Sequence, residues 1–208
     1  MFTQDEAKFV GVDVGGSRKG FHAVLLSGNQ VLSRMHATDA SGVRSWCLRA
    51  DVLAIGIDAP CRWSAAGGGR LAERELAKAG MSTFSTPTRE RGESHAFYQW
   101  MMNGARLYKE LEVDYPLFDG QRNNDRFCVE TFPHAVACAL AGRIVSAKQK
   151  RVIRESLLHG LGLRNKLLSN IDYIDAALCA IAAESVAQGS YRKYGSAAEG
   201  YIVTPDQS

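Results

Sequence analysis

Short apolar runs separated by turns dominate the beginning of the chain and predict β-strands. Residues 9–14 are rich in valine and end at the glycine pair 15–16, and apolar residues resume at 21–26. A weaker run follows at residues 31–35, after a turn that contains Gly28. Strand-length segments joined by such short turns predict an antiparallel meander of three strands.

Two further apolar runs predict strands of a different kind. Residues 52–57 form a continuous apolar stretch that stops at Asp58, shortly before a proline. An uninterrupted apolar run is typical of a strand that is buried on both faces, as in a parallel sheet. Residues 127–129 lead to Glu130 and predict the last strand of the sheet.

Helical periodicity and capping residues predict the helices. The last helix is apolar on almost every side, which indicates that it is almost entirely buried. Pro133 suits the first turn of a helix, whereas Ser41 and Asn170 are favourable N-caps. Residues 81–93 show no periodicity and are expected to be irregular. The predicted helices cover residues 43–49, 70–79, 94–112, 133–140, 147–159 and 171–183.

These elements indicate an α/β protein with helices on both faces of a sheet. The chain has 208 residues, of which 46% are hydrophobic and 23% charged, as in ordinary globular proteins. No repeat or change of composition indicates a linker, so we expect one domain, residues 1–208, with a helical insertion at about residues 61–125. The longest apolar run, residues 176–183, is far shorter than the roughly 20 residues that a membrane-spanning helix needs, and we expect no membrane partner.

Cysteine usage and the first residues bear on the cellular compartment. The five cysteines are odd in number and isolated, so we expect them to be reduced and mostly buried. Residues 1–6 are acidic and lack the apolar core of a secretory signal. Both features favour a cytoplasmic location. Because 25 Lys and Arg residues nearly balance 22 Asp and Glu residues, net charge neither demands nor excludes a nucleic-acid partner.

Carboxylates at the ends of apolar segments are the most informative feature of the sequence. Asp13, Asp58 and Glu130 each end an apolar strand, and Asp172 and Asp175 interrupt an otherwise apolar helix. A buried carboxylate is costly unless a partner compensates its charge. The carboxyl ends of neighbouring parallel strands meet at one edge of a sheet, and we expect the last helix to cross that edge. A hard divalent cation, Mg²⁺ or Mn²⁺, would compensate the crowded charges.

Each of these carboxylates also has a purely structural interpretation. Asp13 precedes a glycine pair and could simply form a turn, and Asp58 could cap the segment that follows it. Asp172 lies in the first turn of its helix, where a carboxylate is favourable without any metal. Asp175 lies beyond that turn and is therefore the better ligand candidate of the two.

Basic residues form a second candidate site. Several lie in and before the helix predicted at residues 147–159, and others lie in the first turn and in the irregular segment. Such a group either binds phosphates or forms a solvated helix face, and the sequence favours neither. The candidates for nucleic-acid binding are Arg18, Lys19, Lys148, Lys150 and Arg151, and Arg89, Arg91, Arg143 and Arg154 are further basic residues of this kind.

Other catalytic motifs are absent from the sequence. The glycines near residue 15 do not form a dinucleotide-binding fingerprint, and neither a Walker P-loop nor a Gly-x-Ser-x-Gly elbow occurs. The five histidines are dispersed without the spacing of a zinc site. His134 could lie near Glu130, although a histidine on a helix surface is the simpler interpretation. Trp63 and Tyr98 could stack on bases, but single aromatic residues are more often part of a core.

An ordered set of short motifs carries a resemblance to a known family. The motifs are Gly-Val-Asp-Val-Gly-Gly, Ile-Asp-Ala-Pro, Arg70 followed by Glu73-Arg74-Glu75, Thr86-Pro87, Glu130-Thr-Phe-Pro and Asp172-Tyr-Ile-Asp175-Ala-Ala. Over nearly the whole chain this set resembles the domain-of-unknown-function family 429 (DUF429), predicted nucleases of RNase H-like fold. The resemblance implies a three-layer fold around a mixed five-stranded sheet of order 3-2-1-4-5, in which strand 2 is antiparallel.

The resemblance also implies roles for the acidic residues. Asp13, Asp58 and Asp175 match the acidic residues of the RNase H-like superfamily, and Glu130 matches the Glu-x-x-Pro element of the family. A nuclease of this kind hydrolyses phosphodiester bonds of DNA or RNA. Two Mg²⁺ or Mn²⁺ ions roughly 3.5–4 Å apart would both bind Asp13. Asp58 would complete the ligand set of one ion, and Asp175 would complete that of the other. Glu130 would orient water or a metal ligand, and Asp172 is an additional candidate ligand.

Two other classes of function stay open. The segment from Asp13 to Ser17 also resembles the first phosphate loop of ATP-dependent phosphotransferases of the actin and sugar-kinase type, although no second loop of this kind occurs in the sequence. The chain could also be a non-catalytic binding module that keeps the RNase H-like fold. The retained carboxylates argue against such a module without excluding it.

Overall fold

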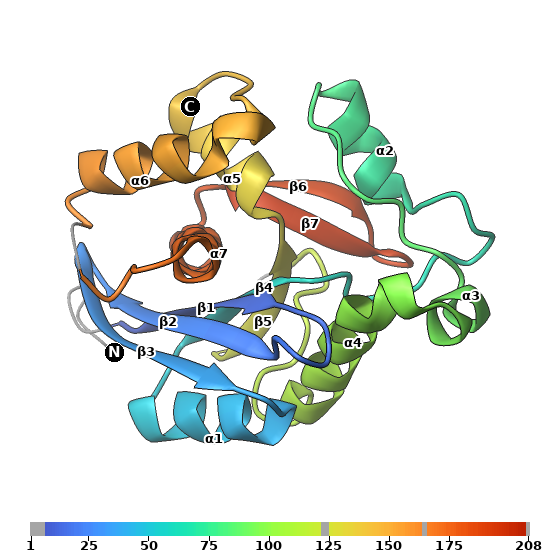
Figure 1. The fold of residues 1–208 in the computed structure, drawn as a ribbon, viewed down its shortest axis with the longest axis horizontal. Coiled ribbons are helices and arrows are strands. Elements are labelled where there is room, and N and C mark those ends of the chain that lie inside the picture. The colour runs from blue at the N-terminus through green and yellow to red at the C-terminus, as the bar shows by residue number, and fades with distance from the viewer. Residues whose placement is uncertain (1–6, 122–124, 164–165, 207–208) are drawn as a thin grey trace.

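A computed structural model describes residues 7–121, 125–163 and 166–206, and in this part of the chain one mixed sheet of seven strands is flanked by helices (Figure 1). Residues 1–6, on which the expectation about a secretory signal rests, lie outside these ranges. The strands are β1 (Phe9–Val14), β2 (Phe21–Ser27), β3 (Gln30–Ala37), β4 (Ala54–Asp58), β5 (Phe127–Thr131), β6 (Tyr191–Ser196) and β7 (Gly200–Pro205).

The sheet has the order β3-β2-β1-β4-β5-β7-β6. The expected meander is confirmed, because β2 pairs antiparallel with both β1 and β3. Strands β4, β5 and β7 continue the sheet in parallel with β1, and β6 closes it antiparallel to β7. The prediction of a five-stranded sheet of order 3-2-1-4-5 is therefore wrong in the number of strands and in the order beyond β5. At that edge the C-terminal hairpin adds the strands β7 and β6.

The helices cover both faces of the sheet. They are α1 (Ala40–Ala50), α2 (Leu71–Lys78), α3 (Arg89–Ser94), α4 (Gln99–Leu111), α5 (Pro133–Ala141), α6 (Lys150–Gly160) and α7 (Ile171–Gln188), with short 3-10 turns at η1 (Ala96–Tyr98) and η2 (Ala147–Gln149). Helix α7 lies between the sheet and the helices α5 and α6, whereas α1 and α4 pack on the opposite face (Figure 1). No helix in the described ranges is both long enough and apolar enough to cross a membrane.

Several predicted helix boundaries need correction. The helix expected at residues 94–112 is interrupted, because α3 already occupies residues 89–94 and α4 begins only at Gln99. Asp39, not Ser41, caps α1, and its carboxylate accepts a hydrogen bond of 2.8 Å from the backbone of Gly42. Asn170 caps α7 as expected, by accepting a hydrogen bond of 3.0 Å from the backbone of Tyr173.

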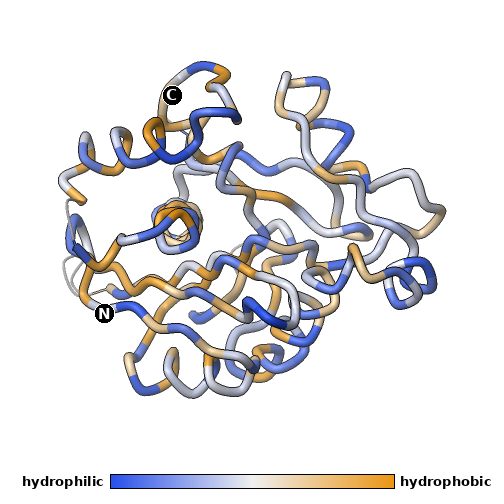
Figure 2. Tube along the Cα trace, viewed as in Figure 1, coloured by the Kyte–Doolittle hydropathy of each residue, from blue (hydrophilic) through white to orange (hydrophobic). Residues whose placement is uncertain are grey.

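Helix α7 is the centre of the fold and is apolar on nearly all sides, as its colour in Figure 2 shows. It approaches the sheet at Gly11 of β1 and Gly56 of β4, which face each other in the parallel register. A methyl group on Gly11 would lie 1.7 Å from the carbonyl oxygen of Ala176, and one on Gly56 would lie 2.0 Å from that of Cys179. The two glycines therefore allow the helix backbone to rest directly on the sheet.

The segment between β4 and β5 carries the expected helical insertion. Helix α2 packs on β6, and α4 packs on α1 and on the end of β1. The side chain of Asn103 in α4 donates a hydrogen bond of 2.8 Å to the carbonyl oxygen of Gly15, and the hydroxyl of Tyr108 donates one of 3.0 Å to that of Ala59. These bonds fix α4 to the ends of β1 and β4, next to the candidate site.

Candidate functional site

The structure brings the predicted carboxylates to one pocket of about 260 Å³ at the carboxyl ends of β1, β4 and β5. Asp13 lies directly opposite Asp58 in the register of β1 and β4. Helix α7 crosses this edge and contributes Asp172 and Asp175, and Glu130 from β5 lines the same pocket. The expected convergence therefore follows from the parallel register and from the position of α7.

Asp13 is buried and lacks full compensation of its charge. Its pKa is raised from 3.8 to about 7, chiefly by burial and also by the charges of Asp175 and Asp172, against the opposing effect of Lys19. The ammonium of Lys19 lies 3.6 Å from Oδ2 of Asp13, which is beyond hydrogen-bond distance. Among the described residues, no hydrogen-bond partner is found for this buried oxygen. An unpaired buried carboxylate oxygen marks a place where a cation would be stabilised.

Asp58 ends β4 beside Asp13 and is only partly exposed. Burial raises the pKa of Asp58 well above its ordinary value, and the charges of Asp13 and Asp175 raise it further, while Arg154 acts in the opposite direction. Three carboxylates therefore repel one another in one pocket. Groups arranged in this way take up protons or a divalent cation to lower the repulsion.

Asp175 has a protein partner that the sequence did not indicate. Nη1 of Arg154 in α6 donates a short hydrogen bond to Oδ1 of Asp175, and the ammonium of Lys150 lies 4.0 Å from Oδ2. Burial still raises the pKa of Asp175, because it outweighs the effect of Arg154. Arg154 lines the pocket and is buried with only 5% of its surface exposed, so it is not part of a solvated helix face.

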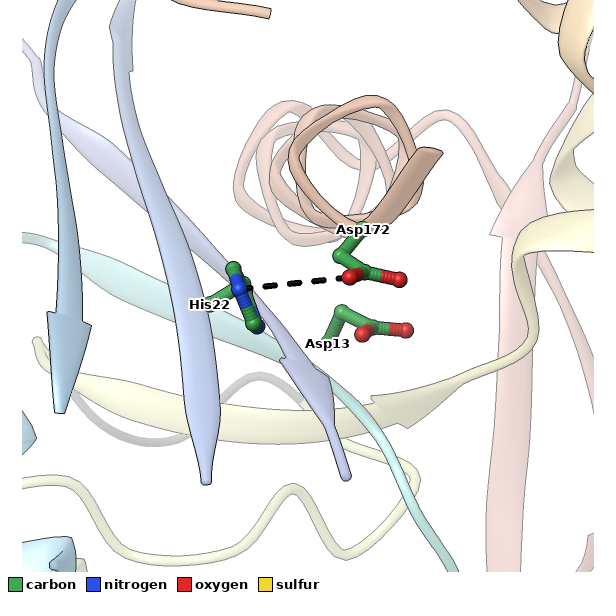
Figure 3. Close-up of side chains that lie close together, drawn as sticks. All are labelled: Asp13, His22 and Asp172. Carbon is green, nitrogen blue, oxygen red and sulfur yellow. Dashed lines mark ion pairs between the residues drawn. The ribbon is translucent and has the colours of Figure 1, made fainter. Parts of the chain in front are cut away.

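Asp172 forms a separate small group with Asp13 and His22, shown in Figure 3. Each of these three residues offers one atom that could bind a metal ion, and the three atoms all lie within 4.8 Å of one another. Among the described residues, Asp58 and Asp175 do not belong to such a group. Nε2 of His22 lies 3.9 Å from Oδ2 of Asp172. The Lys19 ammonium lies 2.6 Å from Oδ1 of Asp172 and supplies a positive charge to this group.

His22 is the residue of the pocket region that sequence reasoning missed. It pairs with Asp13 across the β1–β2 hairpin, so both side chains lie on the same face of the sheet. Burial lowers the pKa of His22, which favours the neutral imidazole that binds metals. The sequence predicted the hairpin, but the connection over residues 15–20 is longer than the two-residue turns that fix a register, so the pairing of His22 with Asp13 did not follow from it.

Glu130 is held by other protein groups. Both of its oxygens accept hydrogen bonds from the guanidinium of Arg70, and Oε2 also accepts one of 2.8 Å from the backbone of Cys61. Arg70 is fully buried and also pairs with Glu73, which in turn accepts a hydrogen bond from the backbone of Thr86. Glu130 therefore lines the pocket as part of a buried ion-pair network, and its oxygens are less available to a metal ion than those of Asp13.

The candidate basic residues lie at different places around this pocket. Lys19 and Lys150 line it, whereas Arg18 and Lys148 are exposed in the turn after β1 and in η2. Arg151 is exposed and pairs with Glu155 on its own helix, at 3.0 Å. His134, for which a helix surface was the simpler interpretation, is instead buried on α5.

The donor set fits Mg²⁺ or Mn²⁺. Asp13 and Asp58 offer hard oxygen ligands from adjacent strands, and the unpaired oxygen of Asp13 lies at the pocket. Oδ1 of Asp175 is paired with Arg154 and Oδ1 of Asp172 with Lys19, so each of these carboxylates already meets a cation through one oxygen. The pocket therefore offers oxygen ligands from several carboxylates around Asp13, and the ligand atoms of Asp13, His22 and Asp172 lie within 4.8 Å of one another.

Fold and pocket together define an α/β protein with an acidic pocket where adjacent parallel strands end. A family model described as a protein of unknown function, DUF429, matches residues 11–199, and the chain belongs to this family, as its motifs predicted. None of the curated proteins and none of the solved structures that were compared gives a significant match.

Proposed function

We propose that the protein is a metal-dependent nuclease with an RNase H-like fold. The strands β3-β2-β1-β4-β5, with β2 antiparallel to its neighbours, form the arrangement expected of that fold. The observation that carries the proposal is the crowding of Asp13, Asp58 and Asp175 at one pocket, with one buried oxygen of Asp13 lacking a hydrogen-bond partner among the described residues. Such a site lowers its electrostatic free energy when Mg²⁺ or Mn²⁺ binds.

The residues around the pocket have distinct tasks in this proposal. Asp13 and Asp58 would hold the cation, and Asp175 would complete the ligand set after release from Arg154. A divalent cation bound there would activate water and stabilise negative charge on the phosphate. Lys150, at the rim, would attract the phosphodiester and hold it near the carboxylates. Glu130 would act through Arg70 by keeping the end of β5 in place.

Hydrolysis of labelled DNA and RNA, in single-stranded and duplex form, tests the proposal. We expect the parent protein to cleave at least one of these substrates with Mg²⁺ or Mn²⁺, and we expect Asp13→Asn to abolish cleavage. Chelation of divalent ions should stop the reaction of the parent. Equal cleavage by parent and variant, or cleavage that survives chelation, would contradict the proposal.

Metal binding provides a second readout that does not depend on the substrate. Mn²⁺ at 100 times its dissociation constant should raise the free energy of unfolding of the parent by about 2.7 kcal/mol. Asp13→Asn should lose most of this stabilisation. Metal binding without cleavage of any substrate would identify the non-catalytic binding module instead.

A further inference from the structure

An exposed group of aromatic side chains stands beside the acidic pocket. Phe84 and Phe97 have 61% and 50% of their surface exposed, which is unusual for residues of this kind. Their ring centroids lie 5.7 Å apart in an edge-on arrangement, and Trp100 lies 6.3 Å from Phe84. We call Phe84, Phe97 and Trp100 the aromatic platform.

The aromatic platform is continuous with the pocket that holds the carboxylates. Phe84 and Trp100 line this pocket together with Asp13 and Asp58. Phe84 belongs to the segment between α2 and α3, and Trp100 lies in the first turn of α4. An exposed aromatic face next to charged groups is typical of a binding site, because a core would enclose it.

Helix α4, which carries Trp100 of the platform, is held in a fixed position. Gly104 of α4 packs so closely on Ala59 that a methyl group at Gly104 would lie 2.4 Å from the Cβ atom of Ala59. Together with the bonds from Asn103 and Tyr108 to the ends of β1 and β4, this contact anchors α4 to the strands that carry the carboxylates. An aromatic ring on a helix fixed in this way binds a flat ligand without a large ordering cost.

We propose that the aromatic platform stacks an unpaired nucleobase, so that the preferred substrate is single-stranded or locally unpaired nucleic acid. This inference rests on the proposed nuclease function and names its substrate class. Bases in a duplex are already stacked and paired, so their faces cannot reach Phe84, whereas every unpaired base offers a face for stacking. Lys19 and Lys150 at the rim of the pocket add positive charge for the attached phosphates.

The chemistry of the platform differs from that of a surface for protein docking. It adjoins a pocket whose groups are suited to cations and phosphates, and its rings present faces and edges in place of aliphatic side chains. Of the aromatic residues singled out in the sequence, Trp63 packs on Gly92, whereas Tyr98 lies beside the platform, with its ring centroid 5.1 Å from that of Phe97.

Binding measurements on a variant that cannot cleave test the inference. In the Asp13→Asn background, fluorescence anisotropy would follow a labelled single-stranded oligonucleotide, a strand of equal length that carries abasic sites, and a blunt duplex. Phe84→Leu keeps an apolar side chain but removes the ring. We expect it to weaken binding of the normal single strand about five- to hundredfold, and to leave the abasic strand and the duplex unaffected.

The control is Val113→Ala, which changes another exposed apolar residue that does not line the pocket. It should bind all three probes like the background protein. The salt dependence of binding should be unchanged in Phe84→Leu, because no charge is altered. Phe97→Leu is a second variant of the platform. Like Phe84→Leu, it should weaken binding of the normal single strand and leave binding of the other two probes unchanged.

The outcomes separate the inference from the proposed function. Equal affinity of Phe84→Leu and its background for the normal single strand would overturn the inference, and so would an equal loss for the abasic strand. If the base-dependent loss is found but the parent protein cleaves no substrate, base stacking is supported and the nuclease proposal fails. If the parent cleaves nucleic acid and Phe84→Leu binds and cleaves single strands like the parent, only the inference fails.

Discussion

Asp13 and Glu130 are both buried carboxylates of the same pocket, yet their charges are compensated in opposite ways. Glu130 receives three hydrogen bonds from Arg70 and the backbone of Cys61, whereas Oδ2 of Asp13 has no hydrogen-bond partner among the described residues and lies 3.6 Å from the ammonium of Lys19. A buried charge without hydrogen bonds destabilises the folded state until it is protonated or neutralised. At the scale of single residues, this contrast separates a binding group from a structural one.

The raised pKa of Asp13 predicts how stability depends on pH. Between its ordinary value of 3.8 and the folded value of about 7, the folded state binds more protons than the unfolded state. The free energy of unfolding therefore decreases as pH rises through this window, and the loss is complete above about pH 7. In Asp13→Asn the contribution of Asp13 is removed while those of Asp58 and Asp175 remain, so this dependence should be weaker, and the variant should be more stable than the parent at pH 8 and similar to it near pH 4.

Urea unfolding in the presence of a chelator measures this difference. Because one pKa unit corresponds to about 1.4 kcal/mol, the gain at pH 8 should reach a few kcal/mol. The chelator is needed because a divalent cation would stabilise only the parent. A difference between parent and variant that is the same at both pH values would contradict the assignment of the pKa shift.

Glu130→Gln should affect stability more than metal binding. The substitution leaves the buried guanidinium of Arg70 with only the charge of Glu73, so we expect a loss of about 3 kcal/mol or more in the free energy of unfolding. The folded variant should bind Mn²⁺ like the parent, which isothermal titration at low temperature can measure. If Mn²⁺ binding is lost while stability is kept, Glu130 is a metal ligand and its structural role is wrong.

At the scale of elements, the contact between α7 and the sheet determines the shape of the pocket. Gly56→Ala would place a methyl group 2.0 Å from the backbone of Cys179, and backbone atoms cannot move aside as a flexible side chain can. We expect the free energy of unfolding to fall by about 3 kcal/mol or more. We also expect weaker Mn²⁺ binding, because α7 would be displaced together with Asp175. Thermal unfolding and Mn²⁺ titration test both effects.

Gly160→Ala is the matched control for this substitution. Gly160 lies at the end of α6, and a methyl group there would have no atom within 4 Å among the described residues. The control should be as stable as the parent and should bind Mn²⁺ equally well. If Gly56→Ala behaves like Gly160→Ala, α7 does not rest on the sheet as described.

Helix α6 contributes a cation that competes with the proposed metal. Arg154→Met would free Asp175, and we expect the affinity for Mn²⁺ to rise about tenfold or more. The reason is that a neighbouring cation lowers the pKa of a carboxylate by about one to three units, and one unit corresponds to a tenfold change in an equilibrium constant. Arg151→Met on the same helix is the control, because Arg151 pairs with Glu155. Unchanged Mn²⁺ affinity in Arg154→Met would show that Asp175 is not a ligand.

The elements also show what the sequence could predict. Apolar runs were sufficient for β1, β2, β4, β5 and the buried helix α7, because burial on both faces leaves a continuous pattern, and a weaker run predicted the partly exposed strand β3. The hairpin of β6 and β7 was missed, because β6 is a polar edge strand of sequence Tyr-Arg-Lys-Tyr-Gly-Ser and lacks that pattern. The carboxylates were found from their positions, but the burial of Arg70 and Arg154 depends on contacts between distant segments that periodicity does not encode.

At the scale of the whole molecule, the exposed charges on and beside α6 determine how far a nucleic-acid footprint extends from the pocket. If Lys148 and Arg151 contact phosphates, Lys148→Gln with Arg151→Gln should reduce the slope of log affinity against log salt by about 0.7 for each lost contact on a single strand. The same measurement on Arg49→Gln with Lys109→Gln is the control, since these residues lie on α1 and α4 at the opposite face of the sheet. Equal slopes in both variants would place the footprint elsewhere, with Arg18 as the next candidate.

The position of α7 on β1 also has a consequence for how the protein is made. Asp172 is synthesised 153 residues after Lys19, which at roughly 5 to 20 residues per second corresponds to about 10 to 30 seconds. During this interval the nascent chain has β1 and β4 but not the helix that covers their glycine-lined face. The ribosome-bound intermediate therefore exposes an apolar surface that chaperones recognise, and the acidic pocket can form only near the completion of synthesis.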